Sequence, residues 1–209
     1  MKNNRLIPEK TVFPFILLVF LFFLWAVPNN LTDTMLAAFK RIMSLTDSQT
    51  AWIQVVCYLL GYGCFAIPAA IYIKKHTYKS AVMLGLALCS IGTMLFYPAL
   101  KDNYISSFLS FGLYLFAIFI LFAGLSVLET STNSYVYALG SSATATRRLN
   151  FAQSFNPFGA LTGVIISQTF VLSNLNTLSA GQRTQISANE LLEIQNLELT
   201  SVTRTYMVL

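Results

Sequence analysis

Two acidic side chains stand inside long apolar stretches of this sequence. Asp33 lies in a stretch that begins near Val12, and Glu129 lies in a later one that ends near Gly140. An ionised carboxylate in the middle of a bilayer costs from roughly 2.5 to more than about 10 kcal/mol, so such a group is normally shielded, paired or protonated. A carboxyl group kept away from water can take up and release a proton near neutral pH. Both positions therefore meet the physical requirement for proton coupling.

Each acid has polar or aromatic neighbours at helical spacing. Trp25 and Asn29 precede Asp33 by eight and four residues, so the three share one helix face. Asn133 follows Glu129 by four residues. Amide and carboxyl groups can satisfy sugar hydroxyls, and an indole ring can stack on an apolar sugar face. This pattern favours a neutral polyhydroxylated ligand.

A third polar group opens the last long apolar stretch. Gln153 and Asn156 lie one helical turn apart, and Pro157 removes a helical hydrogen bond beside them, so it can bend the helix there. Together with Asn29 and Asn133, these side chains can line one cavity between three helices.

All of these residues also have a purely structural interpretation. A protonated carboxyl group at Asp33 or Glu129 can donate a hydrogen bond between packed helices. Trp25 can be ordinary packing in the core or against lipid. The amides can join helices without touching a ligand; they are Asn29, Asn30, Asn133, Gln153 and Asn156. Gly159 and Gly163 form a GxxxG pattern, which is typical of close helix packing.

The composition defines the environment of these groups. Of 209 residues, 56% are hydrophobic and 10% charged, against about 25% charged residues in a soluble domain, and the mean hydropathy is +0.64. A membrane-spanning helix needs about 20 apolar residues. We expect five spans at about 12–39, 48–73, 80–98, 108–139 and 150–174, a solvent loop over 175–203, and the start of a sixth span at 204. The sequence thus predicts an all-α membrane protein.

Basic residues gather between the spans. The N-terminal tail, the loop 74–79 and the pair Arg147 and Arg148 hold eight of the 13 Lys and Arg residues. Cytoplasmic loops of membrane proteins carry the excess of Lys and Arg. We therefore expect a multi-pass protein of the cell (inner) membrane with a cytoplasmic N-terminus.

Several function classes are disfavoured. The net charge of +5 does not indicate nucleic-acid binding, because no basic stripe lies on a soluble face. The chain has a single histidine, no phosphate-cradling glycine loop before a lysine, and no His or Cys pair at metal spacing. Cys57, Cys64 and Cys89 lie in apolar segments, where they act as small hydrophobes. We expect no enzyme activity, no cofactor and no metal.

A series of short motifs is distinctive in its order. The motifs are Phe22-Phe23-Leu24-Trp25-Ala26, Asn29-Asn30-Leu31-Thr32-Asp33, Lys74-Lys75 with Tyr78-Lys79, Leu128-Glu129-Thr130 with Asn133, and Arg148-Leu149-Asn150-Phe151-Ala152-Gln153-Ser154-Phe155-Asn156 followed by Phe158-Gly159. This series, from about residue 13 to the last residue, resembles the fucose-proton symporter family of the major facilitator superfamily.

The resemblance implies a twelve-helix transporter of two six-helix halves that binds a monosaccharide between them. Asp33 and Glu129 match the family's proton-coupling acids, and Asn30, Gln153 and Asn156 match its sugar-facing positions. The chain then corresponds to the N-terminal six-helix half, truncated at the start of the sixth helix. Because alternating access needs two halves rocking about a central site, we expect no transport by this chain alone.

The sequence also departs from the family pattern. Pro28 precedes Asn29 where a small residue is usual, and Pro157 follows Asn156 where a serine is usual. Both departures affect helix bending and substrate preference more than the fold.

Two hypotheses of different classes follow. In the first, the chain is the N-terminal half of a proton-coupled symporter for fucose or a related hexose, and its partners are the sugar, protons, the lipid bilayer and the missing C-terminal half. In the second, it is a non-transporting membrane sensor or interaction subunit that retains a half-transporter. The residues do not separate fucose from glucose, galactose or an N-acetylhexosamine.

Overall fold

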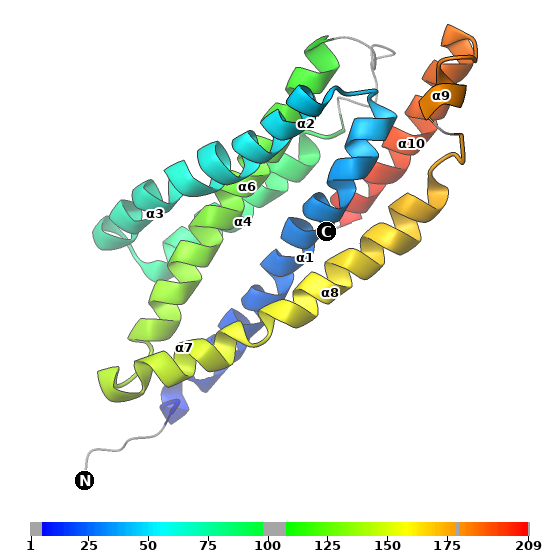
Figure 1. Cartoon of the computed structure of the whole chain (residues 1–209). Helices are drawn as coiled ribbons and strands as arrows, with labels where there is room; N and C mark the ends of the chain where they lie inside the picture. The colour runs from blue at the N-terminus through cyan, green and yellow to red at the C-terminus, as the bar shows by residue number, and fades with distance from the viewer. Residues whose placement is uncertain (1–5, 98–107, 179, 209) are drawn as a thin grey trace.

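The computed structural model describes residues 6–97, 108–178 and 180–208, and over these residues the chain forms six helical rods that run alternately up and down (Figure 1). The first rod is α1 (Val12–Ile42), preceded by η1 (Glu9–Thr11). The second is continuous through α2 (Asp47–Gln54), the π-helical η2 (Val55–Gly63) and α3 (Cys64–Lys75). The third and fourth are α4 (Tyr78–Met94) and α6 (Phe108–Ala138).

The fifth rod is made of several helical pieces: η3 (Ser142–Thr144), α7 (Ala145–Gln153), α8 (Asn156–Ile166), η4 (Ser167–Val171) and η5 (Leu172–Asn174). The short α9 (Ala180–Arg183) leads into the sixth rod, α10 (Ala188–Val208).

The apolar helices confirm the prediction of an all-α membrane protein. Within the described residues, four helical stretches are long and apolar enough to cross a bilayer: Glu9–Ile42, Asp47–Lys75, Phe111–Ala138 and Ser142–Asn174. The third rod, Tyr78–Met94, is shorter but also apolar. Its helix ends four residues before the expected limit at 98, which lies outside the described residues.

The second span begins with a capping box. The Gln49 backbone N–H donates to Thr46 Oγ1 over 3.3 Å, and the Thr46 N–H donates to Gln49 Oε1 over 2.9 Å. These two bonds satisfy backbone donors that the helix itself leaves free.

The sixth helix differs from the prediction. A solvent loop was expected over 175–203, but α10 begins at Ala188. A second capping box starts it, because the Glu190 N–H donates to Ser187 Oγ and the Ser187 N–H donates to Glu190 Oε2. The Ser-x-x-Glu spacing was present in the sequence, and it marks this helix start better than hydropathy does.

Charged residues of this segment are buried. Arg183 of α9 donates two hydrogen bonds to the Glu198 carboxylate of α10, at 3.0 and 2.5 Å, and both side chains are at most 4% exposed. The backbone N–H of Asn176 donates to the same carboxylate over 2.8 Å. This ion pair ties the segment before α10 to the helix, which is why polar residues expected in water lie inside the fold.

The fifth rod is broken where its proline pattern predicted a bend. Helix α7 ends at Gln153, and α8 starts at Asn156 with Pro157 in its first turn. Proline fits the first turn of a helix, where its missing N–H is not needed. Gln153 and Asn156 therefore end one helix and begin the next.

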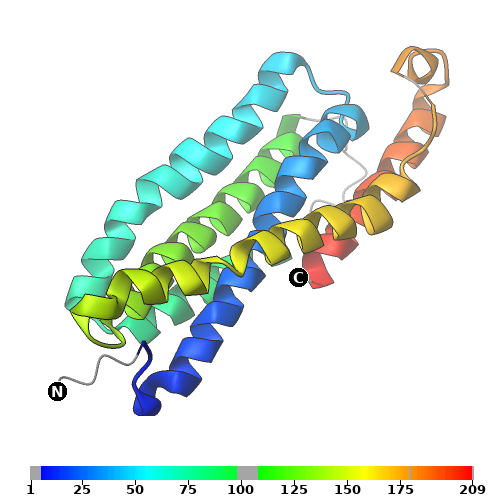
Figure 2. The ribbon, with the colours of Figure 1, turned by 60° about the horizontal axis from the view of Figure 1, so that its bottom comes forward.

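Glycines bring the spans into backbone contact. Helix α8 lies along α1 in both views (Figures 1 and 2), and a Cβ atom on Gly159 would lie 2.1 Å from Phe23 O. One on Gly163 would lie 2.5 Å from Val27 O. The close packing predicted from the GxxxG pattern is thus confirmed. Glycines in the same role on the second, third and fourth rods are Gly61, Gly85, Gly92 and Gly124.

A buried arginine closes one end of the bundle. Arg148 is fully buried, and it donates to Val136 O and Tyr137 O, both over 2.8 Å, in the last turn of α6. It also donates to Leu6 O over 3.2 Å and to Thr144 Oγ1 over 3.1 Å. The free carbonyls at a helix C-terminus carry partial negative charge, so they compensate this cation without a carboxylate.

We expect the α1–α8 contact to tolerate no added methyl group. Gly159→Ala places a carbon against the Phe23 carbonyl, and overpacking of this kind costs about 1–3 kcal/mol. The temperature at which the detergent-solubilised protein loses its size-exclusion peak should therefore fall. Gly112→Ala is the matched control, because a Cβ atom there meets nothing within 4 Å. Equal effects of the two substitutions would contradict this account of the packing.

Candidate functional site

The predicted polar face of α1 lies half inside and half outside the bundle. Trp25 is only 4% exposed, packs on Phe22 with ring centroids 4.3 Å apart, and borders a cavity of about 170 Å³ that Leu125 and Leu128 of α6 also line. Asp33, two turns further along the same face, is exposed. Helix α8 crosses α1 obliquely in Figure 2, and one end of this face is covered whereas the other is open. Trp25 is therefore a core residue in this conformation and does not share an open face with Asp33.

A tyrosine of the second span holds Asp33. The Tyr58 hydroxyl, from the π-helical η2, donates a hydrogen bond to Asp33 Oδ1. Sequence reasoning missed Tyr58, because a tyrosine in an apolar run carries no signal of its own and its partner lies 25 residues away.

The neighbouring Thr32 faces the interior instead. Its Oγ1 lies 2.6 Å from the hydroxyl of Tyr206 on α10, and both groups are buried. Thr32 Oγ1 also donates to Pro28 O over 2.8 Å, so the Tyr206 hydroxyl is the donor in the bond between the two side chains.

The predicted residues of α6 and α7 come together. Glu129 is half-buried and interacts with the Asn133 side chain one turn further along α6. The Gln153 Nε2 atom of α7 donates to Asn133 Oδ1 over 3.1 Å. Gln153 is exposed, so the group is open at one side. A carboxyl group and two amides thus form one polar cluster on two helices, and we refer to Glu129, Asn133 and Gln153 as the amide cluster.

The other predicted amides bind backbone carbonyls. The Asn156 Nδ2 atom donates to Phe22 O of α1 over 3.5 Å, and the Asn30 Nδ2 atom donates to Ala26 O over 2.9 Å on its own helix. Asn29 differs, because its Oδ1 atom is buried without a hydrogen-bond partner among the described residues. Asn156 and Asn30 therefore serve helix packing in this conformation, whereas Asn29 keeps an unused acceptor.

The two acids occupy equivalent positions. Asp33 and Glu129 each lie nine residues before the last residue of their helices, Ile42 and Ala138. At 1.5 Å rise per residue, each lies about 14 Å from the end of its helix. Since α1 and α6 run in opposite directions, Glu129 lies toward the end of the bundle that holds the N-terminus and Asp33 toward the opposite end (Figure 1).

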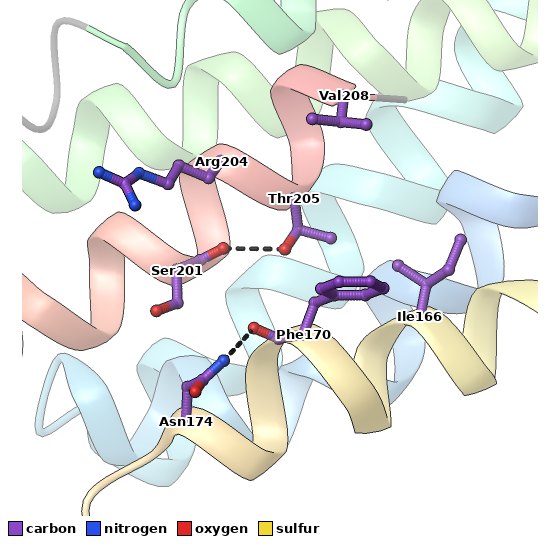
Figure 3. Close-up of a pocket in the computed structure, with 7 residues that line it drawn as sticks. All are labelled: Ile166, Phe170, Asn174, Ser201, Arg204, Thr205 and Val208. Atoms are coloured by element: carbon purple, nitrogen blue, oxygen red, sulfur yellow. Dashed lines mark hydrogen bonds between the residues drawn. The ribbon is translucent and has the colours of Figure 1, made fainter.

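A groove beside the sixth rod belongs to neither acid. This groove of about 350 Å³ separates the end of the fifth rod from α10 (Figure 3), and its lining residues are Ile166, Phe170, Asn174, Ser201, Arg204, Thr205 and Val208. The Asn174 amide donates to Phe170 O and the Thr205 hydroxyl to Ser201 O, so these polar groups are already used within their own helices. None of the predicted site residues lines this groove.

The described part of the chain offers no metal site, because no three His, Cys, Asp or Glu side chains gather there. Its three cysteines are free.

Comparison with known proteins identifies relatives of this arrangement. No protein-family model matches the chain. It is 39% identical over 207 residues to the L-fucose-proton symporter of Haemophilus influenzae, covering 93% of this chain and 47% of the relative. The L-fucose-proton symporter of Escherichia coli is 39% identical over 198 residues, covering 95% and 44%. A glucose/galactose transporter of Brucella abortus is 32% identical over 156 residues, covering 75% and 36%.

Solved structures agree with the sequence comparison. A crystal structure of a major facilitator superfamily transporter in the outward conformation matches with a TM-score of 0.81 and 38% identity, over 96% of this chain and 47% of the transporter. A structure of the E. coli fucose-proton symporter gives a TM-score of 0.80 and 37% identity, over 96% and 46%. The chain spans a little less than half the length of these relatives, which are transporters and not enzymes. It is a multi-pass membrane protein of the fucose-proton symporter family within the major facilitator superfamily and corresponds to the N-terminal half of its relatives.

Proposed function

We propose that this chain forms the N-terminal half of a proton-coupled monosaccharide symporter, for fucose or a related hexose, and that it transports only when joined to a C-terminal half. The amide cluster carries the proposal: a half-buried carboxyl group is connected to two amides that can also bind hydroxyls. The names of its relatives support this substrate class. The proposed partners are the sugar, protons and the second half.

The two acids have different surroundings and so different proposed roles. Glu129 is half-buried beside amides, so its charge state can alter how Asn133 and Gln153 present donors and acceptors to a sugar hydroxyl. Asp33 is exposed near the opposite end of the bundle and is well placed to exchange protons with water on that side. Glu129 is thus the proposed substrate-linked proton acceptor, and Asp33 governs proton access.

The sugar contacts follow from the free hydrogen-bonding groups. Gln153 is exposed beside the cluster, and the unpaired Oδ1 atom of Asn29 can accept a bond from a hydroxyl. We assign Asn133, Asn30 and Asn156 to the same site, the last two after release of their carbonyl partners. Trp25 can contribute a stacking surface only if the cavity beside its ring opens.

The role of the acids can be tested in the two-half protein, meaning this chain continued by a C-terminal half from its own reading frame or from the E. coli symporter. Glu129→Gln and Asp33→Asn keep the size of each side chain but cannot carry the proton. We expect both variants to lose pH-driven sugar accumulation in vesicles by about tenfold or more, since each removes an ionisable group from the coupling path.

Glu190→Gln is the matched control, because this acid lies in an exposed helix cap at the end of the bundle. Uptake against a gradient that survived Glu129→Gln would overturn the proposed role. Sugar binding without transport by the complete reading frame would favour the sensor hypothesis.

The sugar site can be tested by direct binding of L-fucose, D-glucose and D-galactose to the same protein. Gln153→Leu removes an amide from the cluster, and the loss of one or two hydrogen bonds should weaken binding of the preferred sugar by about tenfold. Gln168→Leu changes an exposed glutamine of the same rod and should leave binding unchanged. Equal affinities of wild type and Gln153→Leu would remove Gln153 from the site.

We also propose that the N-terminus lies in the cytoplasm. The connection between α3 and α4, with Lys74 and Lys75, lies at the same end of the bundle as the N-terminus, and the opposite end holds Lys40 and Arg41 (Figure 1). Basic residues favour the cytoplasmic side, although Lys2, Arg5 and Lys101 lie outside the described residues.

Cysteine labelling tests this orientation in a variant whose three native cysteines are replaced. A membrane-impermeant maleimide should label His76→Cys in inside-out vesicles and Ser48→Cys in right-side-out vesicles, because these exposed residues lie at opposite ends of the second rod. The reverse pattern would show that the N-terminus faces outward.

A further inference from the structure

The Tyr58–Asp33 hydrogen bond joins two spans at an acid that the helices themselves leave exposed. Two other titratable groups lie close enough to interact electrostatically with Asp33. They are Cys57 of the second rod and Tyr206 of α10. The Tyr206 hydroxyl is already paired with Thr32, and Cys57 is buried. Among the described residues, Tyr58 is therefore the group that determines how the Asp33 carboxylate is oriented.

The Tyr58 ring is itself held by α6. It meets Phe122 edge-on, with ring centroids 5.5 Å apart and an interplanar angle of 81°. One turn further along η2, Tyr62 also packs on Phe122, and its carbonyl accepts a bond from Ser126 Oγ over 2.7 Å. A Cβ atom on Gly61 would lie 2.8 Å from Phe122 Cβ, so the η2 backbone is pressed against α6. The hydroxyl of Tyr58 is thus presented to α1 from a support built on the helix that carries Glu129.

The π-helical geometry of η2 explains how the ring and the hydroxyl serve two helices. A π-helical segment has wider turns than an α-helix, which changes the direction in which successive side chains leave the axis, and such segments are frequent at functional sites. Here the carbonyl of Tyr62 is satisfied by a side chain of α6, which stabilises the widened stretch.

The same arrangement occurs around the other acid. Asp33 and Glu129 are 96 residues apart in equivalent positions of α1 and α6, and Tyr58 and Gln153 are 95 residues apart. Tyr58 and Gln153 each lie eleven residues after the first residue of their spans, which begin at Asp47 and Ser142. Each reaches a polar side chain of the preceding long helix, Tyr58 reaching Asp33 directly and Gln153 reaching Glu129 through Asn133. We call the first three rods the first repeat and the last three rods the second repeat, because the two sets carry corresponding acid-and-donor pairs.

We infer that Tyr58 is a positioning residue for proton coupling, which holds Asp33 in the first repeat as the Asn133 and Gln153 amides hold Glu129 in the second. This inference rests on the proposed proton coupling at Asp33. As a donor, the Tyr58 hydroxyl stabilises the carboxylate; when Asp33 takes up a proton, the same oxygen can accept a bond from the carboxyl group. Tyr58 also packs on Phe122 of α6. A change in the protonation state of Asp33 can therefore act through Tyr58 on the helix that carries Glu129.

The test uses Tyr58→Phe in the two-half protein, with proton-driven sugar accumulation measured from about pH 5 to pH 8. The substitution keeps the ring on Phe122 and removes only the hydroxyl. Loss of a hydrogen bond to the ionised acid should move the half-maximal pH of accumulation upward by about one unit. Sugar exchange at equal concentrations, which needs a folded two-half protein but no net proton movement, should stay at the wild-type rate.

Tyr62→Phe is the matched control, because Tyr62 makes the same ring contact and has no described bond to an acid. A wild-type pH profile for Tyr58→Phe, or a loss of exchange together with accumulation, would make Tyr58 a packing residue and overturn the inference. Asp33→Asn separates this failure from a wider one: if that variant still accumulates sugar with protons, the proposed function itself is wrong.

Discussion

Direct backbone contact between helices, made possible by glycine, is the constraint on which the rest of the structure depends. Gly159 and Gly163 place α8 against the carbonyls of α1, and Gly61, Gly85, Gly92 and Gly124 do the same between the second, third and fourth rods. In lipid there is no hydrophobic force to drive helices together, so close van der Waals contact must hold the bundle. Once the backbones are this close, the polar side chains beside them have little freedom. In the packed bundle Gln153 meets Asn133 of α6, and Tyr58 meets Asp33 of α1.

The acids then acquire different environments although they occupy equivalent helix positions. On α1 the bundle covers Trp25 and leaves Asp33 open, whereas Glu129 on α6 is half-buried beside amides. The opposite directions of α1 and α6 separate the acids along the bundle axis. One carboxyl group is thereby open to water and the other lies among amides. The side chains that bind beside the acids also differ: a phenol reaches Asp33, whereas amides surround Glu129.

The charged residues that are not part of this site close the ends of the bundle. Arg148 neutralises the last turn of α6 and also binds the backbone of Leu6, and the Arg183–Glu198 pair ties the segment before α10 to that helix. Arg41, in the last turn of α1, donates to the carbonyls of Asn176 and Leu178 from the same segment. Each of these cations is satisfied mainly by carbonyls or by one carboxylate, which permits burial near a membrane surface where an unpaired charge would be costly.

Hydropathy and composition were sufficient to predict the membrane class and five of the helices, because a chain in lipid must form its backbone hydrogen bonds internally and a helix does this within a single segment. The family followed from the order of several short motifs, which composition does not contain. The rarity of acids in such segments was sufficient to single out Asp33 and Glu129. The start of α10 was missed, since its polar residues resemble a loop until Arg183 and Glu198 are seen to pair. Tyr58 was also beyond prediction, and the sequence left open whether Trp25 packs in the core or faces a ligand. Helices that are apolar on every side carry no pattern that says which face meets which neighbour, so these contacts follow from crossing angles and glycine contacts that exist only in the folded bundle.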